Sequence, residues 1–388
     1  MTRVFDGPPL LLMTPGPTRL PQRALDAGAH PMIHHRTAAF SRALVAVIDG
    51  LRPIFGTETA DILPIHTTGR GGMEAAVTNL LSSGDELVAC CNGKFGEMWA
   101  GLAESYGVVV HRICTDWERS VDPAEVERAL DAHPHVRALT IAYGDTSTGV
   151  QNDVAAVLRL TRDRGVLGMV DAISSLGGMP FQVDEWGADV VVTASQKCLM
   201  ASPGLAFVAV SPRAWAAYET ARLPRNYWDF DEVRKTLAKA QPETPGTAPV
   251  HIFLQLAESI AQIHEEGLPN VFARHQEMAR ITRERTAALG LSMLCPQLEK
   301  RSATLTGLVA PDDVPVKAIR DAMRARGILI AGGLGAFTAT SFRIGHMGDI
   351  RPADVERTCA ELGEVLTDLR ARGDRGVSAP ANVALAGS

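Results

Sequence analysis

The stretch Ala188-Asp-Val-Val-Val-Thr-Ala-Ser-Gln-Lys-Cys198 is an apolar run that ends in a single lysine. The consecutive Val190, Val191 and Val192 form a β-branched block that is too short for a free-standing helix, so it predicts a central buried strand. Lys197 then stands at the far end of that strand. An amine held there, out of bulk water, has its charged form disfavoured and becomes a nucleophile toward an aldehyde. On position alone, a surface lysine that follows a strand is the commoner case.

Short apolar segments alternate with helical ones along the middle of the chain. Strands are predicted over 86–91, 108–111, 138–143 and 166–171, and helices over 95–106, 122–133 and 154–164. This alternation predicts a mostly parallel sheet with helices on both faces. Ligands of such sheets bind at the carboxyl ends of the strands. Asp145, Asp171 and Lys197 all fall at that edge.

Asp171 ends the apolar segment Val166-Leu-Gly-Met-Val-Asp171. A carboxylate at the end of a buried strand is costly unless it is paired, and a protonated ring nitrogen is a natural partner. An aspartate that caps the following helix is the alternative. Together with Lys197, however, Asp171 supplies the two groups that pyridoxal phosphate (PLP) requires. The carboxylate keeps the pyridine nitrogen protonated, and the amine forms a Schiff base.

The stretch Ile62-Leu-Pro-Ile-His-Thr-Thr-Gly-Arg-Gly-Gly72 runs from an apolar strand into a glycine-rich turn, which precedes a helix over 73–81. Backbone N–H groups and the positive end of the helix dipole at such a junction suit a phosphate dianion. Thr68 and Arg70 add a hydroxyl and a cation. The glycine spacing matches neither nucleotide-binding motif, so phosphate binding and a plain tight turn are the two interpretations.

Composition excludes several classes of protein. The 388 residues carry a formal net charge of −6 and are 46% hydrophobic, which is typical of a soluble protein with one large and one smaller domain. No basic stripe for nucleic acid is present. The apolar run 10–13 near the N-terminus is too short for export or for a membrane span. Six cysteines without a C-x-x-C pair predict buried thiols and a cytoplasmic location.

Two long amphipathic helices, over 250–266 and 270–290, lead into a smaller α/β region. In its strand Ser341-Phe-Arg-Ile344, Arg343 can bind a carboxylate in a bidentate manner, whereas a solvent-facing arginine is the alternative. The expected domains are an N-terminal segment over 1–20, a large domain over 21–250, a small domain over 251–370 and a disordered tail over 371–388.

Six ordered motifs resemble the class V aminotransferases of the fold-type I PLP enzymes, in particular the alanine–glyoxylate and serine–glyoxylate group. The motifs are Thr14-Pro-Gly-Pro-Thr18, Thr68-Gly-Arg-Gly-Gly-Met-Glu74, Asp145-Thr-Ser-Thr-Gly149, Asp171-Ala-Ile-Ser-Ser-Leu-Gly-Gly178, Ser195-Gln-Lys-Cys198 and Arg343-Ile-Gly-His-Met-Gly348. The resemblance extends from about Leu12 to about Leu369. It implies an α/β fold with a mostly parallel seven-stranded sheet between helices, a smaller C-terminal α/β domain, and a homodimer with shared active sites.

The resemblance also implies roles for individual residues. Lys197 would form the Schiff base, and Asp171 would pair with the pyridine nitrogen. The phosphate would be bound by Thr68, Gly69, Arg70 and Gln196, and by Thr247 of the neighbouring subunit. Phe95 would stack on the ring face, and Thr148 would lie near the phenolic oxygen. The substrate would be bound by Arg343 and Gly16. The implied reaction moves an amino group from a small amino acid of the alanine or serine type to a 2-oxo acid such as glyoxylate or pyruvate.

Other functions remain open at this point. Gly177-Gly-Met179 and the Arg343 motif also resemble pyridoxamine–pyruvate aminotransferase, whereas Thr68-Gly-Arg70 suits PLP held as a cofactor. A desulfurase or lyase on the same fold would need a cysteine in the small domain, and segment 328–343 holds none. A non-catalytic binding protein would not need the strand-end aspartate and lysine together, and an NAD-dependent dehydrogenase would need another glycine spacing. The pair His34-His35 lacks further donors at ligand spacing, so no metal site is expected.

Overall fold

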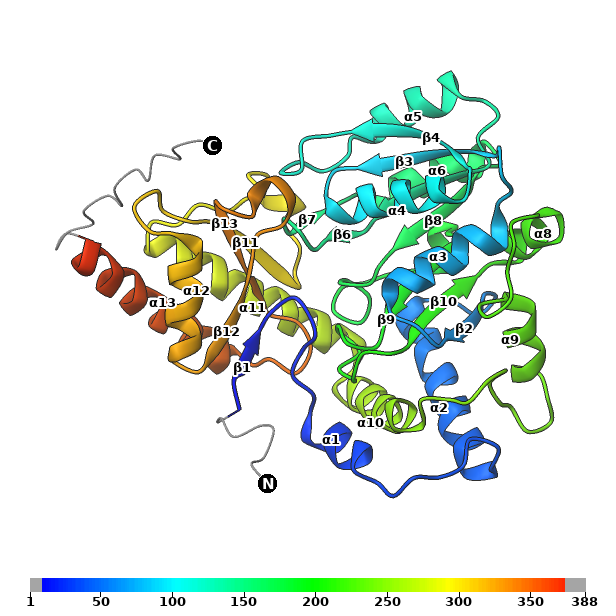
Figure 1. The fold of residues 1–388 in the computed structure, drawn as a ribbon, viewed down its shortest axis with the longest axis horizontal. Helices are drawn as coiled ribbons and strands as arrows, with labels where there is room; N and C mark the ends of the chain where they lie inside the picture. The colour runs from blue at the N-terminus through cyan, green and yellow to red at the C-terminus, as the bar shows by residue number, and fades with distance from the viewer. Residues whose placement is uncertain (1–8, 374–388) are drawn as a thin grey trace, which may run out of the picture.

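The computed structural model of the protein describes residues 9–373. Figure 1 shows two units side by side: a larger one around a seven-stranded sheet and a smaller one around a four-stranded sheet. The C-terminal tail that we expected to be disordered lies, from residue 374 on, outside the described residues, as do residues 1–8. No helix among residues 9–373 is both long enough and apolar enough to cross a membrane.

The large sheet confirms the predicted fold class. Its strands, in spatial order, are β2 (Asp61–Ile65), β10 (Ala206–Val210), β9 (Val190–Ala194), β8 (Leu167–Asp171), β5 (Ala138–Ala142), β3 (Glu86–Cys91) and β4 (Val109–Cys114). All neighbours from β9 to β4 pair in parallel. Strand β10 is antiparallel to both β2 and β9, a direction that sequence alone left open. The carboxyl ends of the six other strands therefore share one edge.

Helices cover both faces of this sheet, which explains why the strands are continuous apolar runs rather than alternating ones. In β9, Val191 packs into one core while Val190 and Val192 pack into the other. The first core is covered by α2 (Ala38–Phe55), α5 (Pro123–Ala132), α6 (Val154–Asp163) and α10 (Val250–Glu266). The second is covered by α3 (Gly69–Leu80), α4 (Lys94–Ser105), α8 (Pro212–Thr220) and α9 (Phe230–Leu237).

The smaller sheet draws strands from both ends of the chain. Its order is β1 (Leu11–Met13), β12 (Ile328–Gly332), β13 (Ser341–Gly345) and β11 (Leu305–Val309). Helices α11 (Leu268–Ala288), α12 (Val316–Ala325) and α13 (Pro352–Gly373) accompany it (Figure 1). We expected residues 1–20 to form a segment of their own, but β1 pairs in parallel with β12. The first strand of the chain is therefore part of the C-terminal unit.

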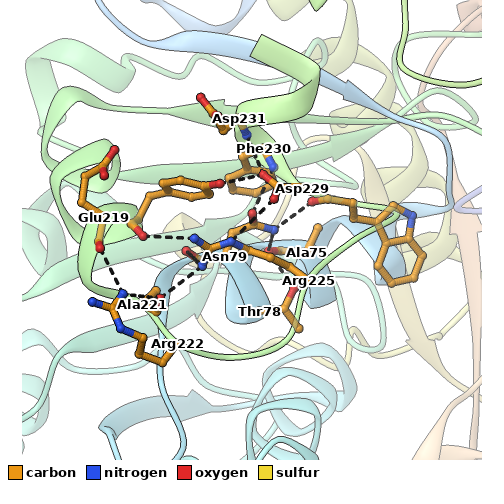
Figure 2. A network of polar contacts seen from close by, with 12 residues as sticks. Ala75, Thr78, Asn79, Glu219, Ala221, Arg222, Arg225, Asp229, Phe230 and Asp231 are labelled. Carbon is orange, nitrogen blue, oxygen red and sulfur yellow. Dashed lines mark hydrogen bonds and ion pairs between the residues drawn. The ribbon is translucent and has the colours of Figure 1, made fainter. Parts of the chain in front are cut away.

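A polar network ties segment 221–231 to the outer face of α3, and Figure 2 shows it from close by. The buried Asn79 donates through Nδ2 to the carbonyls of Ala75 and Trp228, each at 2.8 Å, and its Oδ1 accepts from the Phe230 amide at 3.0 Å. Arg225 lies over the ring of Tyr218 at 3.9 Å. Within this segment α9 begins at Phe230, because Asp229 caps that helix and Phe230 enters the core.

Replacement of Asn79 by alanine should destabilise the protein by about 3 kcal/mol, because the Trp228 carbonyl and the Phe230 amide would both be buried without a partner. Urea denaturation measures this loss. Asn270, an exposed residue that bonds to the Glu266 carbonyl, provides the control: its alanine variant should lose less than about 0.5 kcal/mol. Equal losses in the two variants would contradict the role of the network.

Candidate active site

Four chain segments leave the large sheet at its carboxyl edge and bring the predicted residues together. Strand β8 ends at Asp171, beside Val192 of β9, and the chain after β9 reaches Lys197. Strand β5 leads to Asp145, and β2 leads into the first turn of α3. The sheet edge therefore carries a carboxylate, an amine and a helix N-terminus within one region, as parallel β/α topology dictates.

Lys197 is held in place by the N-terminal chain. Its Nζ donates to the carbonyl of Pro15, while the Thr18 hydroxyl donates to the Lys197 carbonyl at 3.0 Å. A Cβ at Gly16 would lie only 2.8 Å from Nζ, so a side chain there would displace the amine. Burial lowers the pKa of Lys197 to about 8, against the opposing effect of Asp171. The uncharged fraction of the amine therefore grows as the pH rises through 8.

Asp171 is buried, and its Oδ1 accepts a hydrogen bond from the Ile173 amide at 2.8 Å. Burial raises the pKa of Asp171 to about 7; the nearby Asp145 adds to this rise, and Lys197 opposes it. The carboxyl group forms no ion pair with any residue of the described chain. A cationic partner from a bound molecule would therefore stabilise its charged form.

The N-terminus of α3 forms the third part of the site. The helix begins at Gly69 rather than at the expected residue 73, so the glycine-rich stretch is its first turn. Thr68 is the N-cap residue, and its hydroxyl caps no backbone amide. Thr68 and Arg70 are exposed, and their side chains bond to nothing among residues 9–371. First-turn amides with a free hydroxyl and a free guanidinium suit an anion.

Three further residues lie near this edge. The Oε1 atom of Gln196 is buried without a hydrogen-bond partner, next to Lys197. Phe95 is half-buried at the start of α4, and its amide donates to Asp145 at 3.1 Å. Ile173 lies against Gly69, where a Cβ would come within 2.5 Å of its Cδ1 atom. The close approach of these two segments explains why a glycine opens the helix.

Arg343 comes from the smaller sheet. It is 7% exposed; its Nε donates to the Gly332 carbonyl at 2.9 Å and its Nη1 to the Thr146 carbonyl at 2.7 Å. Burial lowers the pKa of Arg343 to about 10, and Asp145 opposes this effect. Nη2 donates to no described protein group. The interpretation as a solvent-facing arginine is wrong, because a buried guanidinium held by two carbonyls retains donors for an anion.

The roles of Thr148 and Thr247 stay predictions, because neither side chain bonds to Lys197, Asp171 or Arg343 among the described residues. Thr148 borders a small cavity with Arg283 and Gly307 of the smaller unit, and its hydroxyl has no partner there. Thr247 is exposed in the loop before α10. Three features of the site were not predicted from the sequence: the Thr146 carbonyl that holds Arg343, the contact of Ile173 with Gly69, and the acceptor role of Asp145. Asp145 alone carried a signal, because it follows an apolar strand as Asp171 does.

Among the described residues, one group of three metal-type donors occurs, formed by Glu86, His111 and His133. It lies at the start of β3, at the opposite end of the sheet from Lys197. His111 Nε2 is 2.7 Å from a Glu86 oxygen, and the two imidazole rings are stacked with centroids 3.5 Å apart. The lone pairs of stacked rings lie in two nearly parallel planes and do not converge on one ion, so we assign no ligand to this group.

Comparisons with known proteins agree with this geometry. Residues 12–351 match the family "Aminotransferase class-V". The chain is 39% identical to the soluble hydrogenase small subunit of a Synechococcus strain, over 92% of this chain and 93% of that protein. It is 35% identical to L-aspartate–glyoxylate aminotransferase of Paracoccus denitrificans, over 92% and 91%.

Among solved structures, alanine–glyoxylate aminotransferase from Nostoc sp. superimposes with a TM-score of 0.89 at 30% identity. The superposition covers 94% of this chain and 97% of that one. A family match over most of the chain, a lysine and an aspartate at the edge of the sheet, and a buried arginine all support the same assignment. This protein belongs to the class V aminotransferase family.

Proposed function

We propose that this protein is a PLP-dependent aminotransferase. It would move the amino group of a small amino acid, of the alanine or serine type, to a 2-oxo acid such as glyoxylate or pyruvate. The observation that carries the proposal is the pair Asp171, buried at the end of β8, and Lys197, half-buried in the turn after β9. Their pKa values, about 7 and about 8, are displaced toward each other by the loss of water. Arg343 adds the cation that an α-carboxylate requires.

The site residues fit the cofactor. The first-turn amides of α3 with Thr68 and Arg70 supply donors for a phosphate dianion. Asp171 is a buried carboxylate without a cationic partner, which suits a protonated pyridine nitrogen. Phe95 and Ile173 offer apolar contact to a flat ring. This match of donor chemistry supports PLP at the carboxyl edge of the sheet, where open α/β sheets bind ligands.

When bound, PLP supplies an aldehyde that condenses with amines and a protonated ring that takes up electrons released at the substrate Cα. The chain supplies the proton transfers. Lys197 has an amine whose pKa near 8 lets it accept a proton from Cα and return one close to neutral pH. Arg343 would hold the α-carboxylate through its free nitrogen, and Gly16 leaves room beside the amine. These residues would bind and orient the substrate and move its protons.

Three alternatives have less support. A desulfurase needs a reactive thiol, but Cys198 is buried and burial raises its pKa to about 12. One relative is named as a hydrogenase subunit. The one group of metal-type donors among the described residues, Glu86, His111 and His133, contains no cysteine, so it does not support that function here. A non-catalytic protein would have no use for a half-buried amine and a buried carboxyl beside an anion site. Pyridoxamine as the amino donor remains a separate outcome of the assay below.

A homodimer would complete the site. Thr247 lies on a face where Arg36 bonds to the Thr244 and Pro245 carbonyls at 2.8 and 3.1 Å. On the same face, His66 and the 69%-exposed Tyr227 line a cavity of about 240 Å³. The exposed Tyr227 ring, near the strand that leads into α3, supports a second subunit that covers this face. The unbridged cysteines agree with a reducing, cytoplasmic location.

Lys197→Ala should abolish the visible absorbance band that PLP gives in the purified wild-type protein. It should also lower turnover of alanine or serine with glyoxylate or pyruvate at least about 100-fold, because the acid–base group is lost. Absorbance spectra and coupled assays measure both, with pyridoxamine included as a donor. Lys235→Ala, at an exposed ion pair on α9, is the control and should change neither. Normal turnover in the Lys197 variant would refute the assignment.

The low pKa of Lys197 predicts its reactivity in protein freed of cofactor. Its uncharged fraction should rise through pH 8, so acylation of Lys197 by acetic anhydride should be half-maximal near that pH. The exposed Lys235, whose pKa is raised above its ordinary value by Asp231, should react only at higher pH. Peptide mass spectrometry over pH 6–11 compares the two. Superimposable profiles would show that burial does not activate Lys197.

Arg343→Gln should raise the KM for the amino donor about 100-fold, because the substrate carboxylate loses a charged partner inside a buried site. The visible absorbance of bound PLP should persist, since Arg343 would contact the substrate and not the cofactor. Arg285→Gln, at an exposed ion pair with Glu356, is the matched control and should leave KM within twofold. A KM below three times the wild-type value would exclude Arg343 from carboxylate binding.

A further inference from the structure

We propose that Asp145 is a positioning residue that sets both the ring of Phe95 and the guanidinium of Arg343. The inference rests on the proposed function, because it assigns these two side chains to the cofactor face and the substrate carboxylate. Asp145 ends β6 (Gly144–Asp145), which forms a hairpin with β7 (Val150–Gln151) after strand β5. Its side chain is fully buried.

The first link joins the hairpin to α4. Asp145 Oδ2 accepts from the Phe95 amide at 3.1 Å, and Oδ1 accepts from the Ser147 amide at 2.8 Å and from its hydroxyl. The Ser147 hydroxyl oxygen in turn accepts from the Lys94 amide at 3.2 Å. The first two residues of α4 are thus fixed by one buried carboxylate and its neighbour. The direction in which Phe95 leaves the helix depends on them.

Gly93 makes this contact possible. Its backbone is extended, with φ at 171°, so no unusual conformation demands glycine there. A Cβ on Gly93 would, however, overlap the carboxyl group of Asp145. The chain before α4 therefore passes directly against the carboxylate. A methyl group at position 93 would displace that carboxylate without removing its charge.

The second link joins the hairpin to the smaller unit. The carbonyl of Thr146, the next residue, accepts from Arg343 Nη1 at 2.7 Å. The Asp145 carboxylate and the Arg343 guanidinium also attract each other, although both are buried and not hydrogen-bonded. A shift of Asp145 would therefore move the carbonyl that holds Arg343 and weaken the field that keeps its charge in place.

These links predict a particular pattern of defects. A misplaced Phe95 weakens cofactor binding, and a misplaced Arg343 weakens substrate binding. A general loss of folding would instead reduce the fraction of active protein, which leaves KM and the cofactor dissociation constant of the remaining enzyme unchanged. The two mechanisms are therefore separable in one set of measurements.

The test uses full-length Asp145→Ala, Asp145→Asn and Gly93→Ala. In Asp145→Ala and Gly93→Ala, we expect the Kd for PLP and the KM for the amino donor to rise at least tenfold. The kcat per bound cofactor should change less than threefold. Asp145→Asn should raise the Kd and the KM by a smaller factor, though at least threefold. Its amide oxygen still accepts from the Phe95 amide, but its attraction for Arg343 is lost. Asp122→Asn, at the exposed N-cap of α5, is the control and should change neither, since asparagine caps equally well.

Measurements on the wild-type protein distinguish a failure of this inference from a failure of the proposed function. If the wild type binds no PLP and transfers no amino group, the proposed function fails. If it does both, but Kd and KM in the three variants stay within twofold of wild type, the assignment of Asp145 alone is overturned. Should Asp145→Ala not fold, the isosteric Asp145→Asn and the charge-preserving Gly93→Ala still decide, because each removes one feature of the contact.

Discussion

The buried carboxyl of Asp171, at the end of β8, and the half-buried amine of Lys197, in the turn after β9, do not bond to each other. The carboxyl accepts from the Ile173 amide, and the amine donates to the Pro15 carbonyl. A direct ion pair would satisfy both charges and close the site. Because each is held by backbone instead, both remain available to a molecule that lies between them. Burial moves both pKa values toward neutrality, which makes proton transfer possible near pH 7.

The smaller unit completes the site through two contacts that begin in different parts of the chain. Strand β1 pairs with β12, and the chain after β1 passes so close to β13 that a Cβ on Gly345 would lie 2.5 Å from the Pro15 nitrogen. The same segment holds Lys197. Arg343 of β13 reaches the Thr146 carbonyl of the large unit. A movement of the smaller sheet would therefore act on the amine and on the arginine together.

Part of this site was predictable, for a physical reason. An apolar run that ends in one charged residue marks a buried strand with its charge at the edge, and both Asp171 and Lys197 were found in this way. The same logic located Asp145, but not its contacts with Phe95 and Ser147, because these depend on how close the hairpin lies to α4. Thr146 and Ile173 carried no signal, since one participates through its carbonyl and the other through its position against Gly69.

The sequence by itself determined the β/α order, the parallel sheet and the edge at which the polar residues gather, because strand length, periodicity and strand-end charges are local properties. Only the tertiary structure decided that β10 runs antiparallel, that β1 joins the C-terminal sheet and that Arg343 faces the large unit. It also placed the Thr148 carbonyl against Gly307 of β11. These features depend on contacts between residues far apart in the chain, and no local pattern encodes which distant surfaces will pack together.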